Sequence, residues 1–476
     1  MPFGAGSRIC PGRYLAHLEM KMAIATLLGR SRLGAALDVP RFAAAIPRER
    51  SSCSNCTLER LNMTTADTES GYAWGRMFAA LAMMTLGGAG MYGVTVVLPE
   101  IQAEFGVARS AASLPYTLTM IGFGIGGVLM GKLSDRFGVI VPVLVGSVCL
   151  ALGFIAAGFA QNLFQFAAVH GLLIGLLGTS GSFVPLVADT ALWFVRRRGI
   201  AVAIVMSGNY LAGTVWPPLM QHFIDTAGWR ATYLGTGLFC LATMPVLALA
   251  LRRKPPAIAE IVRPGAAAPH SSTAATDRPL GFSPGSLQAL LCVAGVACCV
   301  AMSMPQVHMV AYCGDLGYPA ARGAEMLSLM LGFGIVSRLI SGWVVDRIGG
   351  LKTLLLGAAL QASALALFLP FQQLAALYVI SALFGLFQGG LVPSYPIVVR
   401  EYFAPREAGV RTGTVLMATL FGMALGGWLP GWIFDLTGSY RAAFANGLAW
   451  SLVTTTIALI LLNRARRQAS MVRQAA

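Results

Sequence analysis

Charged side chains are scarce in this chain of 476 residues. Asp, Glu, Lys and Arg together make up 11% of it, whereas hydrophobic residues make up 56%. A soluble globular protein carries about 25% charged residues. The composition therefore excludes an ordinary soluble enzyme, a disordered chain and a coiled coil. It is typical of a membrane protein with several spans, whose lipid-facing surface holds the additional apolar side chains.

Patterns that bind metals or nucleotides are also lacking. Nine cysteines occur, but Cys53 and Cys56 form a single C-x-x-C without a second pair or neighbouring histidines, so we expect neither a metal site nor a disulfide framework. No G-x-x-x-x-G-K-[ST] sequence occurs, which argues against transport driven by ATP. The net charge of +15 comes from basic residues between apolar runs, so it indicates membrane topology and not nucleic-acid binding.

Apolar runs long enough to cross a bilayer follow one another from about residue 74 onward. They cover residues 74–99, 110–132, 139–160, 163–193, 200–224, 230–251, 285–312, 323–345, 351–370, 374–399, 411–434 and 440–462. We therefore predict an all-α membrane protein with twelve transmembrane helices in two six-helix halves, 74–251 and 285–462. A Pro-, Ala- and Ser-rich cytoplasmic linker, 252–284, joins the halves, and a cytoplasmic tail, 463–476, follows them.

The connections between the spans alternate in charge. Those after the even-numbered spans carry most of the Lys and Arg residues, whereas those after the odd-numbered spans carry few. Basic residues concentrate in cytoplasmic loops. The alternation therefore predicts a multi-pass protein of the plasma (inner) membrane with both termini in the cytoplasm.

The loop pattern G-x-x-x-D-R-x-G occurs after the second span and again after the eighth, which indicates a duplicated six-helix unit. Its glycines let the chain turn and a neighbouring helix approach. Its Asp-Arg pair lies at the predicted cytoplasmic interface, where contacts with the other half exist in only one conformation and act as a latch. The predicted latch residues are Gly131, Asp135, Arg136 and Gly138 in the first loop, and Gly342, Asp346, Arg347 and Gly349 in the second.

These two loops, the six-plus-six spans and the basic central connection resemble the major facilitator superfamily. The resemblance covers about residues 74–462 and implies a secondary transporter, in which one half rocks against the other around a site near the middle of the membrane. Several stretches are similar to the monocarboxylate-transporter and oxalate/formate-exchanger branches of this superfamily. They are residues 104–106 with Ser110, residues 193–199, residues 228–230, and Arg338 in the eighth span.

Arg338 is the main candidate for substrate binding. It precedes Asp346 by eight residues, which places it about 12 Å inside the membrane, where an arginine is costly. In the resembling families an arginine of the eighth helix holds the substrate carboxylate, which its planar fork matches. The alternative is permanent pairing with a protein acid or with helix carbonyls. Gly334 stands where some family members carry an acid, and residues 412–428 lack a lysine, so a monocarboxylate is favoured over a doubly charged substrate.

Other polar residues of the spans are further candidates. Asp189, near the end of the fourth span, is either a proton carrier or, as the resemblance implies, a latch residue that pairs with Arg136 or with the basic cluster at 196–198. His308, in the seventh span, is a candidate for substrate binding and proton coupling, with hydrogen-bonded packing as the alternative. The remaining candidates for substrate binding, with helix packing as the alternative, are Tyr92, Asn209 and Tyr210.

The first thirty residues carry an unrelated pattern, F-x-x-G-x-R-x-C-x-G-x-x-x-A-x-x-E, which begins at Phe3. It resembles the haem-ligand loop of the cytochrome P-450 family, in which the position of Cys10 supplies the axial thiolate. About thirty residues cannot enclose a haem. We therefore interpret residues 1–30 as a non-functional fragment, expect no haem or other cofactor, and predict a disordered linker at 31–73.

The sequence thus predicts a secondary active transporter and not an enzyme. Its partners would be the lipid bilayer, a small organic anion such as a monocarboxylate and, for symport, a proton; exchange of anions is the other possible mode. Efflux of drugs or other hydrophobic solutes by the same fold is an alternative function, and it would not require Arg338. A haem-thiolate monooxygenase remnant is a second alternative, which the absence of a Soret band would remove. A membrane sensor that binds without transport is a third.

Overall fold

The computed structural model describes residues 70–194, 197–253, 279–404 and 407–475. Within these ranges, twelve helical segments are long and apolar enough to cross a membrane and no β-strand occurs, which confirms the predicted all-α membrane fold. The predicted haem-loop fragment 1–30, with Cys10, lies outside the described residues. So do most of the predicted linker 31–73 and residues 254–278 of the predicted linker 252–284.

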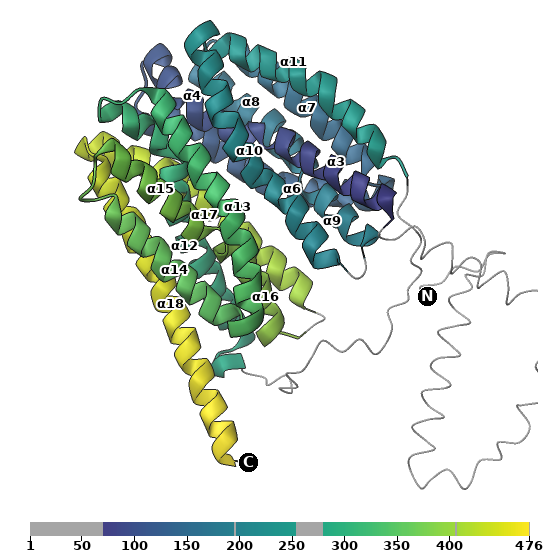
Figure 1. Ribbon diagram of the computed structural model, residues 1–476, viewed down its shortest axis with the longest axis vertical. Coiled ribbons are helices and arrows are strands. Elements are labelled where there is room, and N and C mark those ends of the chain that lie inside the picture. The colour runs from purple at the N-terminus through teal and green to yellow at the C-terminus, as the bar shows by residue number, and fades with distance from the viewer. Residues whose placement is uncertain (1–69, 195–196, 254–278, 405–406, 476) are drawn as a thin grey trace, which may run out of the picture. The chain divides into compact units, whose positions relative to one another are not determined.

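The N-terminal half contains the first six spans (purple to teal in Figure 1). Its helices are α3 (Gly71–Gly87), α4 (Ala89–Phe105), α5 (Arg109–Ala112), α6 (Leu114–Phe137), α7 (Ile140–Gly158), α8 (Leu163–Val169), η1 (His170–Thr179), α9 (Val184–Trp193), α10 (Arg198–Ala227), α11 (Trp229–Ala248) and η2 (Leu249–Leu251). The pair α3 and α4 forms the first span and α5 with α6 forms the second. The fourth span consists of α8, η1 and α9.

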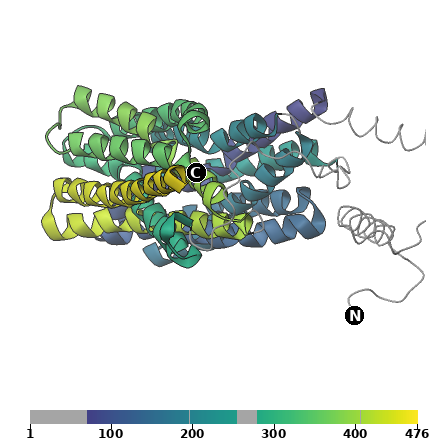
Figure 2. The same cartoon turned by 90° about the horizontal axis from the view of Figure 1, so that it is seen from below.

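The C-terminal half contains the other six spans (green to yellow in Figure 1). Its helices are η3 (Pro279–Gly281), α12 (Pro284–Asp315), α13 (Ala320–Ile348), α14 (Gly350–Leu367), α15 (Leu374–Gln388), α16 (Leu391–Tyr402), α17 (Ala408–Thr437) and α18 (Tyr440–Ala475). The pair α15 and α16 forms the tenth span. Figure 2 shows the helices of this half beside those of the first half from a second direction.

Four spans that were predicted as continuous consist of more than one helical segment, namely the first, the second, the fourth and the tenth. The tenth span breaks between α15 and α16 at Gly389 and Gly390. A Cβ atom at either glycine would lie within 3 Å of Ser337 or Ser341 on α13, so the close packing of these helices requires glycine. The fourth span, predicted over 163–193, contains the π-helical segment η1, which a turn connects to α9.

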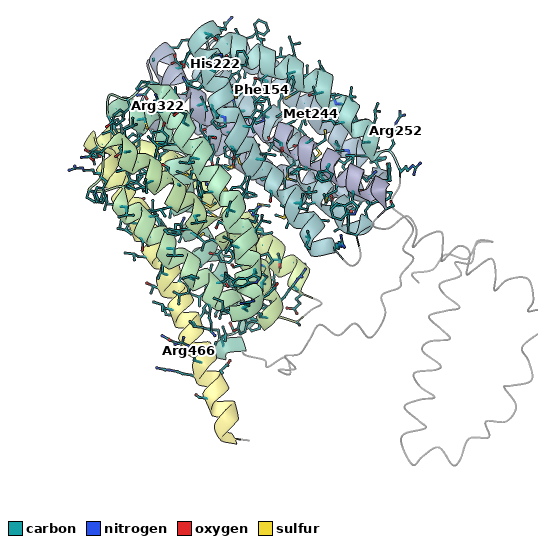
Figure 3. All side chains as sticks on the ribbon, viewed as in Figure 1. Phe154, His222, Met244, Arg252, Arg322 and Arg466 are labelled. Atoms are coloured by element: carbon teal, nitrogen blue, oxygen red, sulfur yellow. The ribbon has the colours of Figure 1, made fainter. Side chains whose placement is uncertain are left out.

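The last helix is longer than predicted. α18 continues to Ala475, beyond the expected end of the twelfth span at residue 462. Residues 463–475 contain neither Gly nor Pro and are rich in Arg, Gln and Ala, which favour helix. Figure 3 labels Arg466 in this extension; Arg252 and Arg322, also labelled there, likewise lie near helix ends and not in the middle of a span.

The helix ends lie at two faces. We name as the predicted outer face the one at which α4, α10, α12 and α17 end, and as the predicted cytoplasmic face the one at which α6 and α13 end. The two halves meet along a seam where α10 contacts α13, where α5 and α6 contact α17, and where α4 contacts α12. Figure 1 shows α10 and α13 side by side along this seam.

Backbones approach closely inside the N-terminal half. A Cβ atom at Gly122 of α6 would lie 2.2 Å from the carbonyl oxygen of Gly171 in η1. A Cβ atom at Gly126, one turn on, would lie 1.9 Å from the carbonyl oxygen of Leu176. Only glycine permits contacts this close, so these two positions set the distance between α6 and the fourth span.

Substituting Gly126 with valine should therefore force α6 away from η1. We expect Gly126→Val to lower the free energy of unfolding by about 1–3 kcal/mol, the usual cost of overpacking. Thermal unfolding of the detergent-purified protein measures the change. Gly235→Ala in α11 is the matched control, because a Cβ atom there meets nothing within 4 Å. Equal shifts in the two variants would show that this contact does not limit the packing.

Candidate functional site

Arg338 lies at the seam, half-buried, ten residues before α13 ends at Ile348. Its Nη1 donates a hydrogen bond to the carbonyl oxygen of Met206 on α10 at 3.2 Å. Its guanidinium carbon lies 4.5 Å from the centre of the Tyr210 ring, also on α10. Its Nε is buried without a hydrogen-bond partner, and Arg338 forms no ion pair with a described residue. The arginine thus keeps an uncompensated charge and an unused donor at the boundary between the halves.

The structure explains why no acid stands one turn before Arg338. A Cβ atom at Gly334 would lie 2.4 Å from Cε1 of Tyr210. A carboxylate side chain at residue 334 would therefore displace the ring that stacks on Arg338. The Tyr210 ring can therefore lie against Arg338 across the seam because residue 334 is a glycine.

A second tyrosine lies near this arginine. Tyr92 of α4 lies within electrostatic range of Arg338, Tyr210 and Tyr116 of α6, and all three tyrosines are buried. The predicted candidates Tyr92, Tyr210 and Arg338 therefore lie near one another, and Tyr116, which the sequence did not indicate, lies near Tyr92. Asn209 is half-buried and faces Gly88, where α3 meets α4.

The break in the tenth span lies beside the same turn of α13. Gly389 and Gly390 pack against Ser337 and Ser341, which flank Arg338, and the Ser341 hydroxyl donates to the Arg338 carbonyl oxygen at 3.0 Å. The N-terminus of α16, which begins at Leu391, follows this break and has no side-chain cap. Its free backbone N–H groups add positive potential at this level of the seam.

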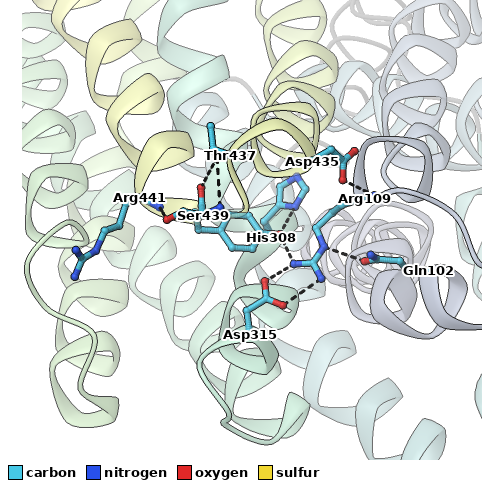
Figure 4. Close-up of polar contacts among 9 residues, drawn as sticks. Gln102, Arg109, His308, Asp315, Asp435, Thr437, Ser439 and Arg441 are labelled. Carbon is cyan, nitrogen blue, oxygen red and sulfur yellow. Dashed lines mark hydrogen bonds and ion pairs between the residues drawn. The ribbon is translucent and has the colours of Figure 1, made fainter.

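A second polar cluster joins the halves at the predicted outer face (Figure 4). Arg109 of α5 forms an ion pair with Asp315 of α12, and its Nε donates to Oε1 of Gln102 at 2.9 Å. Its Nη1 donates to the Tyr440 hydroxyl oxygen at 3.3 Å, and its guanidinium stacks on the Phe434 ring. We call Arg109, Asp315, Asp435 and Tyr440 the outer latch, because the first belongs to the N-terminal half and the others to the C-terminal half.

Asp435 completes this latch through the backbone. Its carboxylate oxygens accept hydrogen bonds from the backbone N–H groups of Arg109 at 2.9 Å and Ser110 at 2.8 Å, where α5 begins. A carboxylate is favourable at the amino end of a helix. Asp435 begins the sequence D-L-T-G-S-Y-R (435–441), which is similar to D-T-A-G-W-R (225–230) in the N-terminal half, so the sequence contains a signal for Asp435. Arg109 and Asp315 have no such signal, because charged residues are common at span ends.

His308 lies beside the outer latch. It is fully buried on α12. Its Nε2 lies 2.8 Å from the carbonyl oxygen of Gly427, and its Nδ1 lies 2.9 Å from the Tyr440 hydroxyl. Both ring nitrogens thus lie within hydrogen-bond distance of a protein partner, which agrees with the alternative of hydrogen-bonded packing for this residue.

The two repeated loops lie at the predicted cytoplasmic face. Gly138 and Gly349 cap α6 and α13 at φ +80° and +84°, a conformation that favours glycine in both copies. Gly131 and Gly342 leave open space or ordinary contact around them. Arg136 stacks on Phe137, and Arg347 stacks on Trp343. Asp135 and Asp346 are exposed and form no hydrogen bond or ion pair with a described residue.

Asp189 has a different partner from the expected ones. Both of its oxygens accept hydrogen bonds from Arg76 of α3, at 2.9 Å each, and the pair is buried. Arg76 also donates to the carbonyl oxygen of Arg253 and stacks on Trp193. The pair lies within the N-terminal half because α3 and α9 are neighbours, a proximity that the order of residues does not disclose.

The described residues offer no arrangement for a metal ion, since no group of three or more His, Cys, Asp or Glu side chains comes together among them. Their six cysteines are all free. Cys298 and Cys299 are fully buried on α12, where they pack as small apolar groups.

Profiles of two protein families match the chain. The Major Facilitator Superfamily profile matches residues 78–362 and 289–475. A Cytochrome P450 profile matches residues 1–37, in agreement with the resemblance of the first thirty residues to a haem-ligand loop.

Similar proteins of known name are transporters. Monocarboxylate transporter 13 of Rattus norvegicus is 27% identical over 411 residues, which cover 83% of this chain and 90% of the relative. Monocarboxylate transporter 11 of Homo sapiens is 27% identical over 412 residues, which cover 79% of this chain and 80% of the relative.

Solved structures have the same fold. A bacterial homologue of the human lysosomal transporter Spinster, in an inward-facing and occupied conformation, aligns with a TM-score of 0.63 at 12% identity, over 84% of this chain and 98% of that one. A peptide transporter in complex with alafosfalin aligns with a TM-score of 0.65 at 14% identity, over 86% and 98%. Given the profile match over most of its length, the chain belongs to the Major Facilitator Superfamily, as a multi-pass membrane transporter related to the monocarboxylate transporters and not as an enzyme.

Proposed function

We propose that this protein is a secondary active transporter of a small organic anion, such as a monocarboxylate, and that Arg338 binds the substrate carboxylate. The observation that carries the proposal is the state of Arg338: a half-buried guanidinium at the seam, whose buried Nε finds no hydrogen-bond partner and whose charge finds no acid among the described residues. The names of the relatives, which are monocarboxylate transporters, support the same class of substrate.

The contacts of Arg338 suit a carboxylate. The Met206 carbonyl accepts a hydrogen bond from Nη1, and the Tyr210 ring covers one face of the guanidinium. The edge formed by Nε and Nη2 therefore stays available for two parallel hydrogen bonds to a carboxylate. The uncapped N-terminus of α16 adds a second source of positive potential beside the same turn. A single bidentate site with one fixed positive charge favours a substrate with one carboxylate over a substrate with two.

Because Arg338 and Tyr210 lie on opposite sides of the seam, the site changes whenever the halves separate. We propose alternating access, with uptake coupled to a proton or to exchange of a second anion. The outer latch closes the predicted outer face in this structure. By the charge of its loops, the protein would lie in the plasma (inner) membrane with both termini in the cytoplasm.

The first test of this proposal is uptake of labelled carboxylates into proteoliposomes, with and without an inward proton gradient. We expect wild type to accumulate at least one monocarboxylate. Removing one partner of a desolvated charge pair costs about 2–5 kcal/mol of binding, so Arg338→Gln should raise the Michaelis constant about 30-fold or more. Arg338→Lys should recover only part of the loss, because lysine lacks the planar fork.

Arg466→Gln in the exposed end of α18 is the matched control, since it removes an arginine far from the seam and should leave uptake unchanged. Uptake of carboxylates by Arg338→Gln at the wild-type rate would remove Arg338 from the site. If wild type moves no carboxylate although it is folded, the anion proposal fails, and efflux of uncharged or cationic solutes becomes the leading function.

We also propose that the repeated loops form the cytoplasmic latch. α6 runs antiparallel to α17 and α13 runs antiparallel to α10 across the seam. Asp135 therefore stands at the same face as the N-terminus of α17, and Asp346 at the same face as that of α10. A carboxylate at a helix N-terminus is favourable by about 0.3–2 kcal/mol, so each pair would stabilise the state in which this face is closed.

In the double variant Asp135→Asn, Asp346→Asn we expect the maximal uptake rate to fall about 3- to 30-fold, because the closed cytoplasmic face is less populated. The Michaelis constant should change little, since neither residue lies near Arg338. Kinetics of the same uptake assay measure both constants, with Lys132→Gln, an exposed charge in the first loop, as the control. An unchanged maximal rate in the folded double variant would contradict this role.

A further inference from the structure

The hydrogen bonds around His308 have fixed directions. A carbonyl oxygen only accepts, so Nε2–H of His308 donates to Gly427. Arg109 only donates, so the Tyr440 hydroxyl oxygen accepts from Nη1. Nδ1 of His308 is the acceptor that the described residues offer to the Tyr440 hydroxyl hydrogen, so the arrangement in which every hydrogen is bonded has Nδ1 as acceptor. The chain then runs from Arg109 to Tyr440, to His308, to Gly427, with a neutral histidine that carries its hydrogen on Nε2.

A second proton on His308 is incompatible with this chain. Nδ1–H and Nη1–H of Arg109 would both be aimed at the Tyr440 oxygen, so two cations would share one neutral acceptor. The Tyr440 hydroxyl hydrogen would also lose its acceptor, because its hydrogen bonds to described residues go only to His308 and Arg109. Tyr440 is 3% exposed, so water does not replace the lost partner while the latch is closed.

Opening the latch removes both conflicts. His308, Tyr440 and Gly427 all belong to the C-terminal half and stay together when the halves separate, whereas Arg109 leaves with the N-terminal half. Water then reaches Tyr440 and His308, accepts the hydroxyl hydrogen and solvates the imidazolium. A proton on His308 is thus tolerated in the open state and opposed in the closed one.

The other groups around His308 do not cancel this effect. Asp435 of α17 is engaged by the backbone of α5, and Asp315, farther along α12, is engaged by Arg109. The Tyr312 ring of α12 meets the Tyr440 ring edge to face, and the uncharged Tyr116 ring of α6 packs against Gly427. From α13, uncharged Gly323 and Met326 face α12, and from α4 the uncharged amide of Gln102 contacts Arg109. Arg109 and Tyr440 are therefore the groups that decide whether Nδ1 can bind a proton.

We propose that Nδ1 of His308 is a proton-binding site that controls the outer latch: a bound proton opens the predicted outer face, and its release allows that face to close. The inference rests on the proposed alternating access but not on the nature of the substrate. It places the site at which external protons act on the transport cycle at the outer latch, away from Arg338.

Spin labels on cysteines at Ala103 of α4 and Arg322 of α13 measure the opening. Both positions are exposed at the predicted outer face, one on each half. Double electron–electron resonance on the full chain in proteoliposomes, with the accessible native cysteines replaced by serine, gives the open and closed populations between pH 8 and pH 5. A proton that binds only the open state raises the ratio of open to closed about tenfold one pH unit below the midpoint of that state.

His308→Gln is the decisive variant. Its amide can donate to Gly427 and accept from Tyr440 but cannot take up a proton, so we expect a closed latch at every pH. His222→Gln on the exposed side of α10 is the matched control and should respond to pH as wild type does. Tyr440→Phe, which removes the shared oxygen, should shift the population toward open at pH 8 and weaken the response to pH.

Distances that do not change with pH in wild type, or an unchanged response in His308→Gln, would overturn the proposal. If His308→Gln does not fold, an unaltered pH response in Tyr440→Phe would overturn the proposal instead. These outcomes are separate from the uptake assay. A pH-dependent opening in a protein that moves no carboxylate would refute the anion proposal alone, whereas carboxylate uptake with pH-independent distances would refute the proton site alone.

Discussion

Charge inside a membrane must be compensated, and the positions of the compensating groups organise this structure. Arg76 meets Asp189 within the N-terminal half, so its ion pair persists in every conformation of the two halves. Arg109 meets Asp315 across the seam, so its compensation lasts only while the predicted outer face is closed. Arg338 also lies at the seam, where the described residues give its guanidinium a carbonyl and an aromatic ring but no acid. Under the proposed function, the substrate carboxylate supplies the missing negative charge.

Packing within a half differs from packing across the seam. Inside the halves, glycines bring backbone against backbone: Gly126 lies against the carbonyl of Leu176, and Gly385 of α15 lies against that of Met330 on α13. Across the seam, Gly334 receives the ring of Tyr210 and Gly427 receives that of Tyr116, although Gly431 at the outer latch also lies close to the backbone of Arg109. A ring can move out of such a contact without unfolding a helix, whereas close backbone packing resists displacement. This difference fits two stiff halves that rock about a side-chain interface.

Much of the fold and part of the site could be predicted, for identifiable reasons. A bilayer requires long apolar helices, so composition and run length suffice for the twelve spans. An arginine in the middle of such a run is rare, so Arg338 could be predicted as a site residue from the sequence. Met206 could not, because it contributes a backbone carbonyl that no residue type marks. Asp189 was expected beside Arg136 or the basic cluster at 196–198, yet Arg76 holds it, because pairing depends on which helices are neighbours. Arg109 could not be predicted as a latch residue, because charged residues are common at span ends.

The sequence by itself determined the fold class, the duplicated halves, the two glycine-capped loops and the presence of one arginine in mid-span, since these follow from composition, periodicity and repeats along the chain. The tertiary structure decided which charges meet. It placed Arg109 against Asp315 and Asp435, which lie more than 200 residues away, and it placed His308 beside Tyr440 of the outer latch. The physical reason is that hydrogen bonds and ion pairs act over about 3 Å in space, whereas the chain encodes only the order of its residues.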